Sequence, residues 1–468
     1  MLWVLLALAV IVHLAGVALF CNLLLSRKRT SAMLIWTVWL LLLPLLGIPL
    51  YLLLGTDRIR RKRLELQGNA ARRREEAARQ VRENGTELPE LLTITGRMEA
   101  NSPGSMERPE IYPHAREYYD ALIEDIRAAE HYIHFQTFVF REDEVGRRFL
   151  EDLVRAATRG VKVRLLVDEL GSPETKEKFF QPLVEAGGQF SWCLTIHPRR
   201  NRYFFNLRNH RKIQLIDSRI AYVGGMNIGL EYEGRIEEIG PWEDMQLSVK
   251  GPVINELQYT FMDDWYFATR QPIEGDFYTR EFQQPGPVPL TVIRTGPDSL
   301  EQSFLKSFIF FCTQARRRLD LFTPYFAPDE AMLLAIQMAA IRGVRVRLMI
   351  PTLNEHKYMV DIGRSFYENL LEAGVEIHEL PDAVNHAKVF IADEDWVMLG
   401  SPNLDMRSIR LNFEVGLLFK DRETVENLDT HYRKLFNRAR QVALDEFRNR
   451  PFKERLKQGW VRLFTPIL

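Results

Sequence analysis

Cysteine is scarce in this chain, and neither sign of charge is in excess. The 468 residues hold three cysteines, Cys21, Cys193 and Cys312, which lie far apart and form no C-x-x-C pair. Their spacing excludes a disulfide framework and a cysteine-based zinc site, and it favours a reducing compartment. Lys plus Arg and Asp plus Glu both number 62, so the formal net charge is zero. This balance argues against a protein that binds nucleic acid mainly through its charge.

Charged side chains are also missing from two N-terminal segments, residues 1–26 and 30–56. Each segment exceeds the roughly 20 apolar residues that cross a bilayer. The short SRKRT loop between them predicts a transmembrane hairpin over residues 1–56, with helices at about 2–25 and 32–54. Prolines and a glycine predict a kink near the end of the second helix: Pro44, Gly47 and Pro49.

The flanks of the hairpin predict its orientation. The loop carries three basic residues, whereas residues 58–63 carry five and residues 72–74 carry three more. The flank with more Lys and Arg remains on the cytoplasmic side of a membrane. We therefore expect the large C-terminal part of the chain to lie in the cytoplasm.

The rest of the chain alternates helix-like and strand-like stretches, which is typical of an α/β fold. AATRGVKVRLL (156–166) and AAIRGVRVRLM (339–349) share eight of eleven residues, which indicates an internal duplication. We predict a charged juxtamembrane linker at 57–112, a first α/β domain at 113–283 and a second at 284–468. The Pro- and Gly-containing segment 274–290 is expected to join the copies, and the second copy ends in an amphipathic tail that suits either a membrane surface or packing on the body.

Two stretches, NHRKIQLIDSRIAYVGGMN and NHAKVFIADEDWVMLGSPN, carry the same spaced set of reactive side chains. The spacing H-x-K-x4-D-x6-G-x2-N is kept in both. The first set is His210, Lys212, Asp217, Gly224 and Asn227; the second is His386, Lys388, Asp393, Gly400 and Asn403. A single His-x-Lys in a strand is usually a pair of exposed residues without a catalytic role, but two matched copies inside a duplicated unit favour catalysis.

These residue types suit the cleavage of a phosphodiester. Imidazole is a good nucleophile toward phosphorus and a good acid near neutral pH. Lysine and asparagine side chains can hold the non-bridging oxygens. One histidine would attack phosphorus while the other protonates the leaving oxygen, and the second would then deprotonate an incoming hydroxyl. We expect no cofactor and no metal, because the lysines supply the positive charge and no metal-ligand cluster is visible.

At these residues the chain resembles the phospholipase D superfamily, and more closely the bacterial cardiolipin synthases. The resemblance rests on RNHRKIQLID, YVGGMNIGLEY, TPYFAPDE and GSPNLDMRSIRLNFEVGLLF, and it covers nearly the whole chain. It implies two phospholipase D-like α/β domains packed around one shared active site, behind the membrane hairpin. It also implies a multi-pass protein of the bacterial cell (inner) membrane. Asn385 departs from the pattern, because an apolar residue is usual before the histidine.

The resemblance further implies an acidic residue about 30 positions after each histidine that orients the imidazole. Asp244 follows His210 by 34 positions and Glu414 follows His386 by 28, so we expect these to be the two acids. The superfamily implies that His210 is the nucleophile and His386 the acid/base, although the sequence itself does not distinguish them.

The expected activity is that of a cardiolipin synthase. It would transfer the phosphatidyl group of one phosphatidylglycerol to another, giving cardiolipin and glycerol through a phosphohistidine. A hydrolytic phospholipase D or another headgroup-exchange enzyme would use the same residues. A nuclease is disfavoured by the hairpin and the balanced charge, and a non-catalytic scaffold is disfavoured by the intact motifs. The partners expected are phospholipids and not nucleic acid; the sequence does not indicate an oligomeric state.

Overall fold

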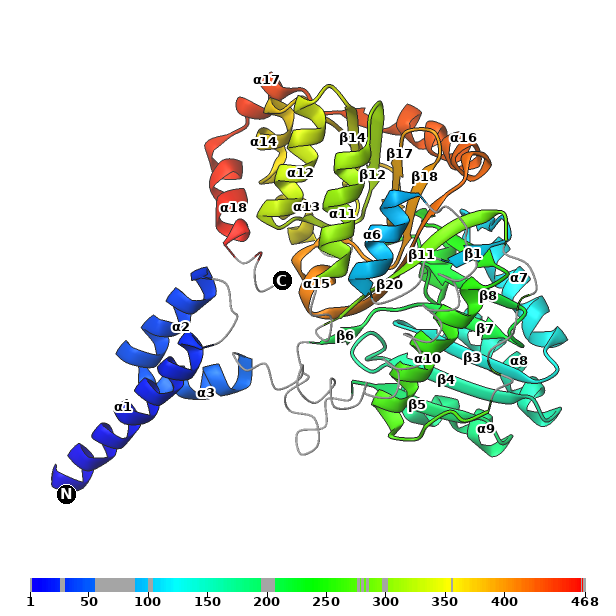
Figure 1. Ribbon diagram of the computed structural model, residues 1–468, viewed down its shortest axis with the longest axis horizontal. Coiled ribbons are helices and arrows are strands. Elements are labelled where there is room, and N and C mark those ends of the chain that lie inside the picture. The colour runs from blue at the N-terminus through cyan, green and yellow to red at the C-terminus, as the bar shows by residue number, and fades with distance from the viewer. Residues whose placement is uncertain are drawn as a thin grey trace. The chain divides into compact units, whose positions relative to one another are not determined.

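The computed structural model describes residues 2–25, 30–54, 89–99, 104–194, 207–275, 278, 282, 286–296, 302–354, 357–463 and 465. These residues fall in two compact units, one with the N-terminal helices and one with everything from Pro89 onward. Most of the predicted linker lies outside the described residues. Figure 1 shows the helices and strands of both units.

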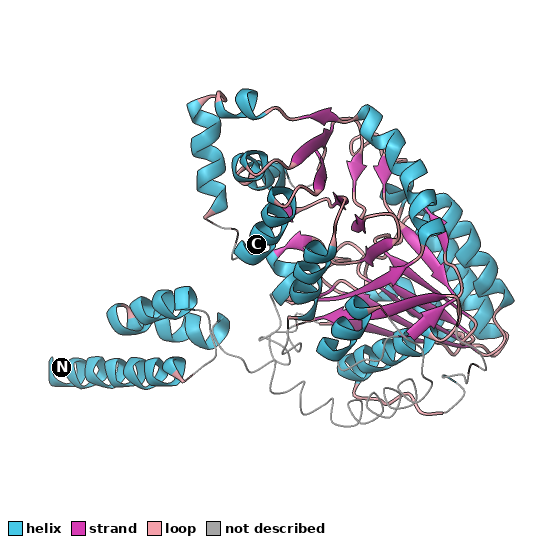
Figure 2. Ribbon diagram, turned by 45° about the horizontal axis from the view of Figure 1, so that its top comes forward, coloured by secondary structure: helices cyan, strands magenta, loops and turns pink. Residues whose placement is uncertain are grey.

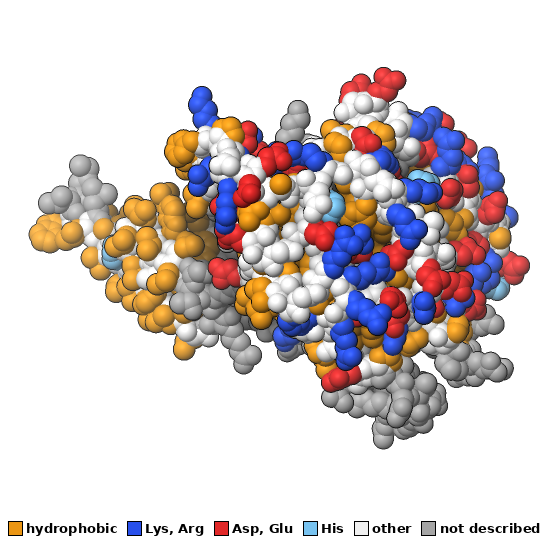
Figure 3. Space-filling model, turned by 90° about the horizontal axis from the view of Figure 1, so that it is seen from above, with side chains coloured by type: hydrophobic (Ala, Val, Ile, Leu, Met, Phe, Trp, Pro, Cys, Tyr) orange, Lys and Arg blue, Asp and Glu red, His pale blue; other side chains and the backbone are white. Residues whose placement is uncertain are grey.

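The N-terminal unit consists of α1 (Leu2–Leu24), α2 (Thr30–Leu42) and α3 (Pro44–Leu54). Among the described helices, α1 alone is long and apolar enough to cross a membrane, through its segment Leu6–Leu24. The three helices share a small cluster of buried side chains: Leu23, Leu40 and Tyr51. Most of the unit's visible surface is hydrophobic (Figure 3).

The segment expected to form the second helix, 32–54, is interrupted at Leu43, because α2 ends at Leu42 and α3 begins at Pro44. Proline has no amide hydrogen, and it disfavours helical geometry in the residue before it, here Leu43. The 13 residues of α2 and the 11 of α3 are each too short alone for a bilayer core of about 30 Å.

The larger unit contains two large sheets, and helices lie against them (Figure 2). The first sheet has the strand order β2-β10-β8-β7-β3-β4-β5. Its strands are β2 (Glu110–Tyr112), β3 (Tyr132–Thr137), β4 (Lys162–Asp168), β5 (Gln189–Cys193), β7 (Ile213–Ile216), β8 (Ile220–Gly224) and β10 (Gln246–Val249). Its helices are α7 (Ala115–Ala128), α8 (Glu144–Thr158), α9 (Gln181–Glu185) and α10 (Val253–Thr269).

The second sheet repeats this order as β11-β20-β18-β17-β12-β14-β15, with β1 and β21 at its two ends. The strands are β1 (Gly104–Met106), β11 (Val288–Thr295), β12 (Arg318–Phe322), β14 (Arg345–Pro351), β15 (Glu376–Leu380), β17 (Val389–Ala392), β18 (Trp396–Gly400), β20 (Asn412–Lys420) and β21 (Arg440–Gln441). The helices of this half are α6 (Glu90–Glu99), α11 (Ser303–Gln314), α12 (Glu330–Ile341), α13 (Lys357–Arg364), α14 (Tyr367–Glu372), α15 (Met406–Arg410), α16 (Arg422–Arg438), α17 (Leu444–Arg448) and α18 (Phe452–Arg462). The matching strand order agrees with the internal duplication seen in the sequence.

Strand periodicity explains how each sheet is covered on both faces. In β3, Ile133 and Phe135 point into the core shared with α7 and α8, whereas His134 and Gln136 bond Gln258 and Asp264 of α10. Successive side chains of a strand point to opposite faces, so one strand serves two different layers. In the second half, β12 does the same: Phe322 stacks on Tyr432 of α16 with ring centroids 3.6 Å apart.

Two described segments differ from the predicted linkers. Within the expected juxtamembrane linker, α6 buries Leu91 and Leu92 in the core of the second half, while β1 and β2 join the sheets. Within the expected joining segment at 274–290, β11 already begins at Val288. Short apolar clusters in otherwise polar stretches are therefore part of the folded body.

Candidate active site

Two short parallel strand pairs connect the halves next to the two histidines. β6 (Arg208–Asn209) pairs with β20, with Asn209 opposite Phe413. β9 (Trp242–Glu243) pairs with β16 (Val384–Asn385), with Glu243 opposite Asn385. In each pair the next residues along the chain are a histidine of one half and an acid of the other. The main chain continues the contact, because His210 N donates to Phe413 O at 2.9 Å and His386 N donates to Glu243 O at 2.7 Å.

Each imidazole is bonded to a carboxylate from the other half. His210 Nδ1 lies 2.8 Å from Glu414 Oε2, and His386 Nδ1 lies 2.7 Å from Asp244 Oδ2. The prediction that each acid orients the histidine of its own copy is wrong. The crossed arrangement follows from the two interhalf strand pairs, which place each acid beside the opposite histidine.

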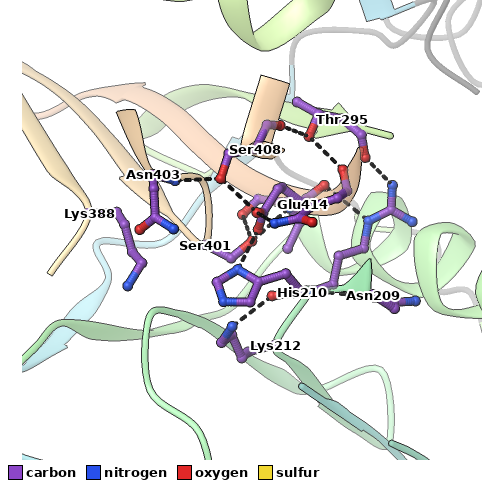
Figure 4. Close-up of polar contacts among 12 residues, drawn as sticks. Asn209, His210, Lys212, Thr295, Lys388, Ser401, Asn403, Ser408 and Glu414 are labelled. Carbon is purple, nitrogen blue, oxygen red and sulfur yellow. Dashed lines mark hydrogen bonds and ion pairs between the residues drawn. The ribbon is translucent and has the colours of Figure 1, made fainter. Parts of the chain in front are cut away.

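The Glu414 carboxylate is held in place by further bonds (Figure 4). Ser408 Oγ donates to its Oε1 at 3.0 Å, and Asn412 Nδ2 donates to the same oxygen at 3.2 Å. Asp244 accepts from its neighbour's amide, Met245 N, at 2.7 Å. These bonds fix each carboxylate, and a fixed carboxylate orients the imidazole that it accepts from.

Both lysines of the motifs are buried beside their histidines. Lys212 Nζ donates to His210 O at 2.8 Å, and Lys388 Nζ donates to His386 O at 2.6 Å. Lys388 Nζ also lies 3.0 Å from both ring nitrogens of His386. By contrast, Nε2 of His210 makes no hydrogen bond to the part of the chain that the structure describes.

The charges of the two motifs act on one another across the halves. Burial lowers the pKa of His210 to about 4, and the positive charges of Lys212 and Lys388 contribute. Burial and the neighbouring Lys388 lower the pKa of His386 to about 3, and Lys212 of the other motif contributes. Both imidazoles are therefore neutral at pH 7. Each motif lies within electrostatic range of the other.

The lysines and acids respond to the same surroundings. Burial lowers the pKa of Lys388 to about 8 and lowers that of Lys212 well below its usual range. For Glu414 and Asp244, burial opposes ionisation, but the adjoining histidine and lysine outweigh it and hold each pKa below its ordinary value. The ionised acids offset the lysine charges inside the protein.

The structure does not bring Asp217 and Asp393 to the histidines. Asp217 follows the far end of β7, where its carboxylate accepts from the amides of residues 130, 131 and 132 at 2.7–2.9 Å. Asp393 follows β17 and accepts from the amides of residues 316, 317 and 318 at 2.7–3.3 Å. The carboxylates of these two aspartates hold the entry to β3 and β12, so the role predicted for them does not involve contact with the histidines.

The two asparagines differ from each other. Asn227 is bonded at both ends, since its Oδ1 accepts from Val139 N at 3.1 Å and its Nδ2 donates to the Tyr232 hydroxyl at 3.0 Å. Asn403 lies beside Lys388 and Ser408 (Figure 4), and its buried Oδ1 has no hydrogen-bond partner among the described residues. Trp242 Nε1, next to His386, is in the same state. Buried polar atoms of this kind are paired by water or a ligand.

Arg211, the residue between His210 and Lys212, has a structural role that the sequence does not predict. Its guanidinium binds both oxygens of Asp264 at 2.7 and 2.8 Å and donates to the carbonyls of Glu414 and Thr295, each at 3.0 Å. It therefore ties α10 of the first half to the strand that carries Glu414. The second copy has Ala387 at this position, so a comparison of the two copies gives no signal for Arg211.

A solved structure shares the fold of the two paired halves. The crystal structure of phosphatidylserine synthase from Haemophilus influenzae Rd KW20 aligns with a TM-score of 0.62 and 16% identity, covering 80% of this chain and 100% of that one. At this identity the likeness shows the fold alone.

The sequence comparisons then show the family. The family model described as "Cardiolipin synthase, PLD-like domain" matches residues 122–265 and 309–436. The cardiolipin synthase of Clostridium perfringens (strain ATCC 13124) is 30% identical over 461 residues, which is 95% of each chain. The major cardiolipin synthase of Bacillus subtilis (strain 168) is 30% identical over 463 residues, again 95% of each chain. The chain therefore belongs to the cardiolipin synthase, phospholipase D-like family, which confirms the resemblance.

Proposed function

We propose that the chain is a phosphatidyltransferase that makes cardiolipin and glycerol from two molecules of phosphatidylglycerol. The observation that carries the proposal is the crossed pairing, in which each half's histidine is bonded to the other half's acid. Such an arrangement leaves neither half complete and favours one shared active site between the domains at 113–283 and 284–468. Family membership supports the choice of lipid substrates.

In the first step, His210 Nε2 attacks the phosphorus of the donor lipid. The bond from phosphorus to the glycerol headgroup breaks, and His386 supplies the proton that the glycerol oxygen needs. Glu414 holds the Nδ1 proton of His210 and stabilises the positive charge that forms on the ring. Lys212 and Lys388 stabilise the charge on the phosphoryl oxygens. The bound phosphodiester anion raises the pKa of His386 toward neutrality, so that the ring can carry that proton.

In the second step, a hydroxyl of the acceptor lipid attacks the phosphohistidine. His386 takes the hydroxyl proton, the nitrogen–phosphorus bond breaks, and His210 returns to its neutral form. The buried Oδ1 of Asn403 can accept a hydrogen bond from the hydroxyl of the acceptor lipid. Asn227, by contrast, holds the loop after β3. Transfer competes with hydrolysis, so a poorly hydrated site favours cardiolipin over phosphatidic acid. The burial of both histidines, whose residues are 8% and 7% exposed, supports this view.

The N-terminal helices are proposed to anchor the enzyme in the bacterial cell membrane. The helix α1 would span the bilayer and α2 with α3 would return as the second arm of a hairpin, leaving the catalytic part in the cytoplasm. Support comes from the apolar length of α1 and from the shared cluster of Leu23, Leu40 and Tyr51.

The test is product analysis with labelled phosphatidylglycerol and the purified full chain. We expect cardiolipin and glycerol from the unmodified enzyme and from His131→Ala, a control on an exposed histidine. His210→Ala and His386→Ala should form neither product. Phosphatidic acid without cardiolipin would identify a hydrolase instead, and an unchanged yield from His210→Ala would contradict the proposed chemistry.

A further inference from the structure

The C-terminal helix α18 (Phe452–Arg462) is held against the second half by its polar side. Lys457 Nζ pairs with Asp361 Oδ2 at 2.6 Å. Arg450 Nε donates to Gln458 Oε1 at 2.8 Å, and Gln458 is only 3% exposed. The Arg462 guanidinium lies 4.4 Å from the ring centroid of Phe366. The helix is thus fixed on the body, and its orientation is set.

The other side of α18 presents a stripe of large hydrophobic side chains. Phe452 is 73% exposed, Leu456 62%, Trp460 63% and Leu463 67%. The steps of four, four and three residues place these side chains on one face of a helix with 3.6 residues per turn. This helix docks through polar residues together with Val461, which packs on the core, and it exposes its larger apolar side chains. A helix on a soluble domain usually buries its apolar face instead. We call the exposed apolar face of this helix the α18 stripe.

Basic side chains accompany the stripe. Lys453 follows Phe452 and Arg455 precedes Leu456 in the sequence, and both basic residues are exposed. The helix holds four basic residues and a single acidic one, Glu454. Aromatic and aliphatic side chains on one face, bordered by Lys and Arg, are typical of helices that lie in the interface of an anionic membrane.

We propose that the α18 stripe docks on the surface of an anionic phospholipid bilayer, with the apolar side chains among the acyl chains and Lys453 and Arg455 at the headgroups. Charge decides between a bilayer and a second copy of the chain. Two copies meeting through this stripe would bring the same basic residues together, whereas anionic lipid neutralises them. Docking fixes one edge of the second half at the surface from which lipid substrates come. This inference depends on the exposed stripe and not on the phosphohistidine chemistry.

A site-directed fluorophore tests the docking directly. Leu456→Cys is made in the full chain carrying Cys21→Ser, because Cys193 and Cys312 are buried while Cys21 is exposed. The matched control is Asn427→Cys on α16, an exposed polar site in the same half. Each protein is reconstituted in phosphatidylglycerol/phosphatidylcholine vesicles, with or without lipids brominated on the acyl chains.

We expect blue-shifted emission from the label at position 456 and at least about twofold quenching by brominated lipid, with neither effect at position 427. Quenching should weaken when phosphatidylglycerol is replaced by phosphatidylcholine. Equal quenching at both positions would overturn the proposal. A blue shift without lipid quenching would also overturn it, because another protein surface would then cover the stripe.

An activity measurement separates docking from folding. Leu456→Asp should lower turnover on vesicles by about tenfold, since a charge in place of a leucine among the acyl chains opposes insertion. Its turnover on detergent-dispersed lipid should equal that of Leu456→Met. An equal loss in both assays would contradict a role at the bilayer surface.

Discussion

His210 of the first half is bonded to Glu414 of the second half, 204 positions away, through a contact of 2.8 Å. The pair His386–Asp244 repeats the contact in the opposite direction at 2.7 Å. Each half thus supplies one histidine for its own motif and one acid for the other. A single half cannot form a complete histidine–acid pair, which gives a physical reason for keeping the two copies in one chain.

Removing one carboxylate charge should affect the histidine of the opposite half. In Glu414→Gln, we expect turnover to fall roughly 100-fold, because the amide does not stabilise the imidazolium. Histidine NMR of the detergent-solubilised chain should show a changed titration for His210 and little change for His386. Asp244→Asn should produce the mirror result. A response of His386 to Glu414→Gln would contradict the crossed pairing.

Replacing the motif aspartates should affect stability more than chemistry. The Asp217 carboxylate accepts three backbone amides, so Asp217→Asn should cost about 2–3 kcal/mol of the free energy of unfolding. Thermal unfolding measures the loss, and turnover per folded molecule at low temperature should remain within about tenfold of normal. Asp393→Asn serves as the matched case in the other half. Abolished turnover with an unchanged melting temperature would show a direct part in the reaction.

The histidine motifs could be predicted because their spacing is local and occurs twice. The crossed acids could not, because the partner of Asp244 depends on how β9 pairs with β16, a contact between segments about 140 residues apart. The structural role of Asp217 could not be predicted for a similar reason. Its carboxylate accepts hydrogen bonds from backbone amides, and every residue type has a backbone, so no sequence pattern marks these partners. In the N-terminal unit, composition predicted apolar helices, but Pro44 decided where the second one breaks.

The buried pair Arg211–Asp264 should be needed for folding. Arg211→Met removes the ion-pair partner of the buried Asp264 carboxylate, which keeps its hydrogen bonds from the amides of Gln136 and Asn209. Losing the positive charge should cost about 3–5 kcal/mol. Adding Asp264→Leu removes the stranded charge and should recover a large part of that loss, as thermal unfolding can show. If the double variant is no more stable than Arg211→Met, the pair is not the reason for the loss.

The charge on Lys388 should set an alkaline limit to activity. Its pKa is about 8 in the folded chain, below the ordinary 10.5, because burial disfavours the cation. Turnover should therefore fall as the pH rises through about 8. Over the same range the unfolded chain binds more protons than the folded one, so this group makes stability rise with pH between about 8 and 10.5.

Lys388→Arg provides the control for that limit. Arginine stays protonated throughout this range, so the alkaline decline should disappear even if the overall rate is lower. Turnover profiles of the two proteins between pH 6 and 10 make the comparison. An identical decline in Lys388→Arg would assign it to another group.

The most direct test is to isolate the covalent intermediate. His386→Asn lacks both the acid for the first step and the base for the second, so it is mixed with a phosphatidyl ester labelled at phosphorus whose phenolate leaving group needs no proton. The mixture is quenched with alkali and digested. Mass spectrometry should find the phosphatidyl group on the peptide that contains His210, and the bond should be labile in acid. Neither His210→Ala nor the variant that combines His210→Ala with His386→Asn should retain label. Cardiolipin formation by the unmodified enzyme, with no histidine-bound phosphorus in any variant, would contradict the account.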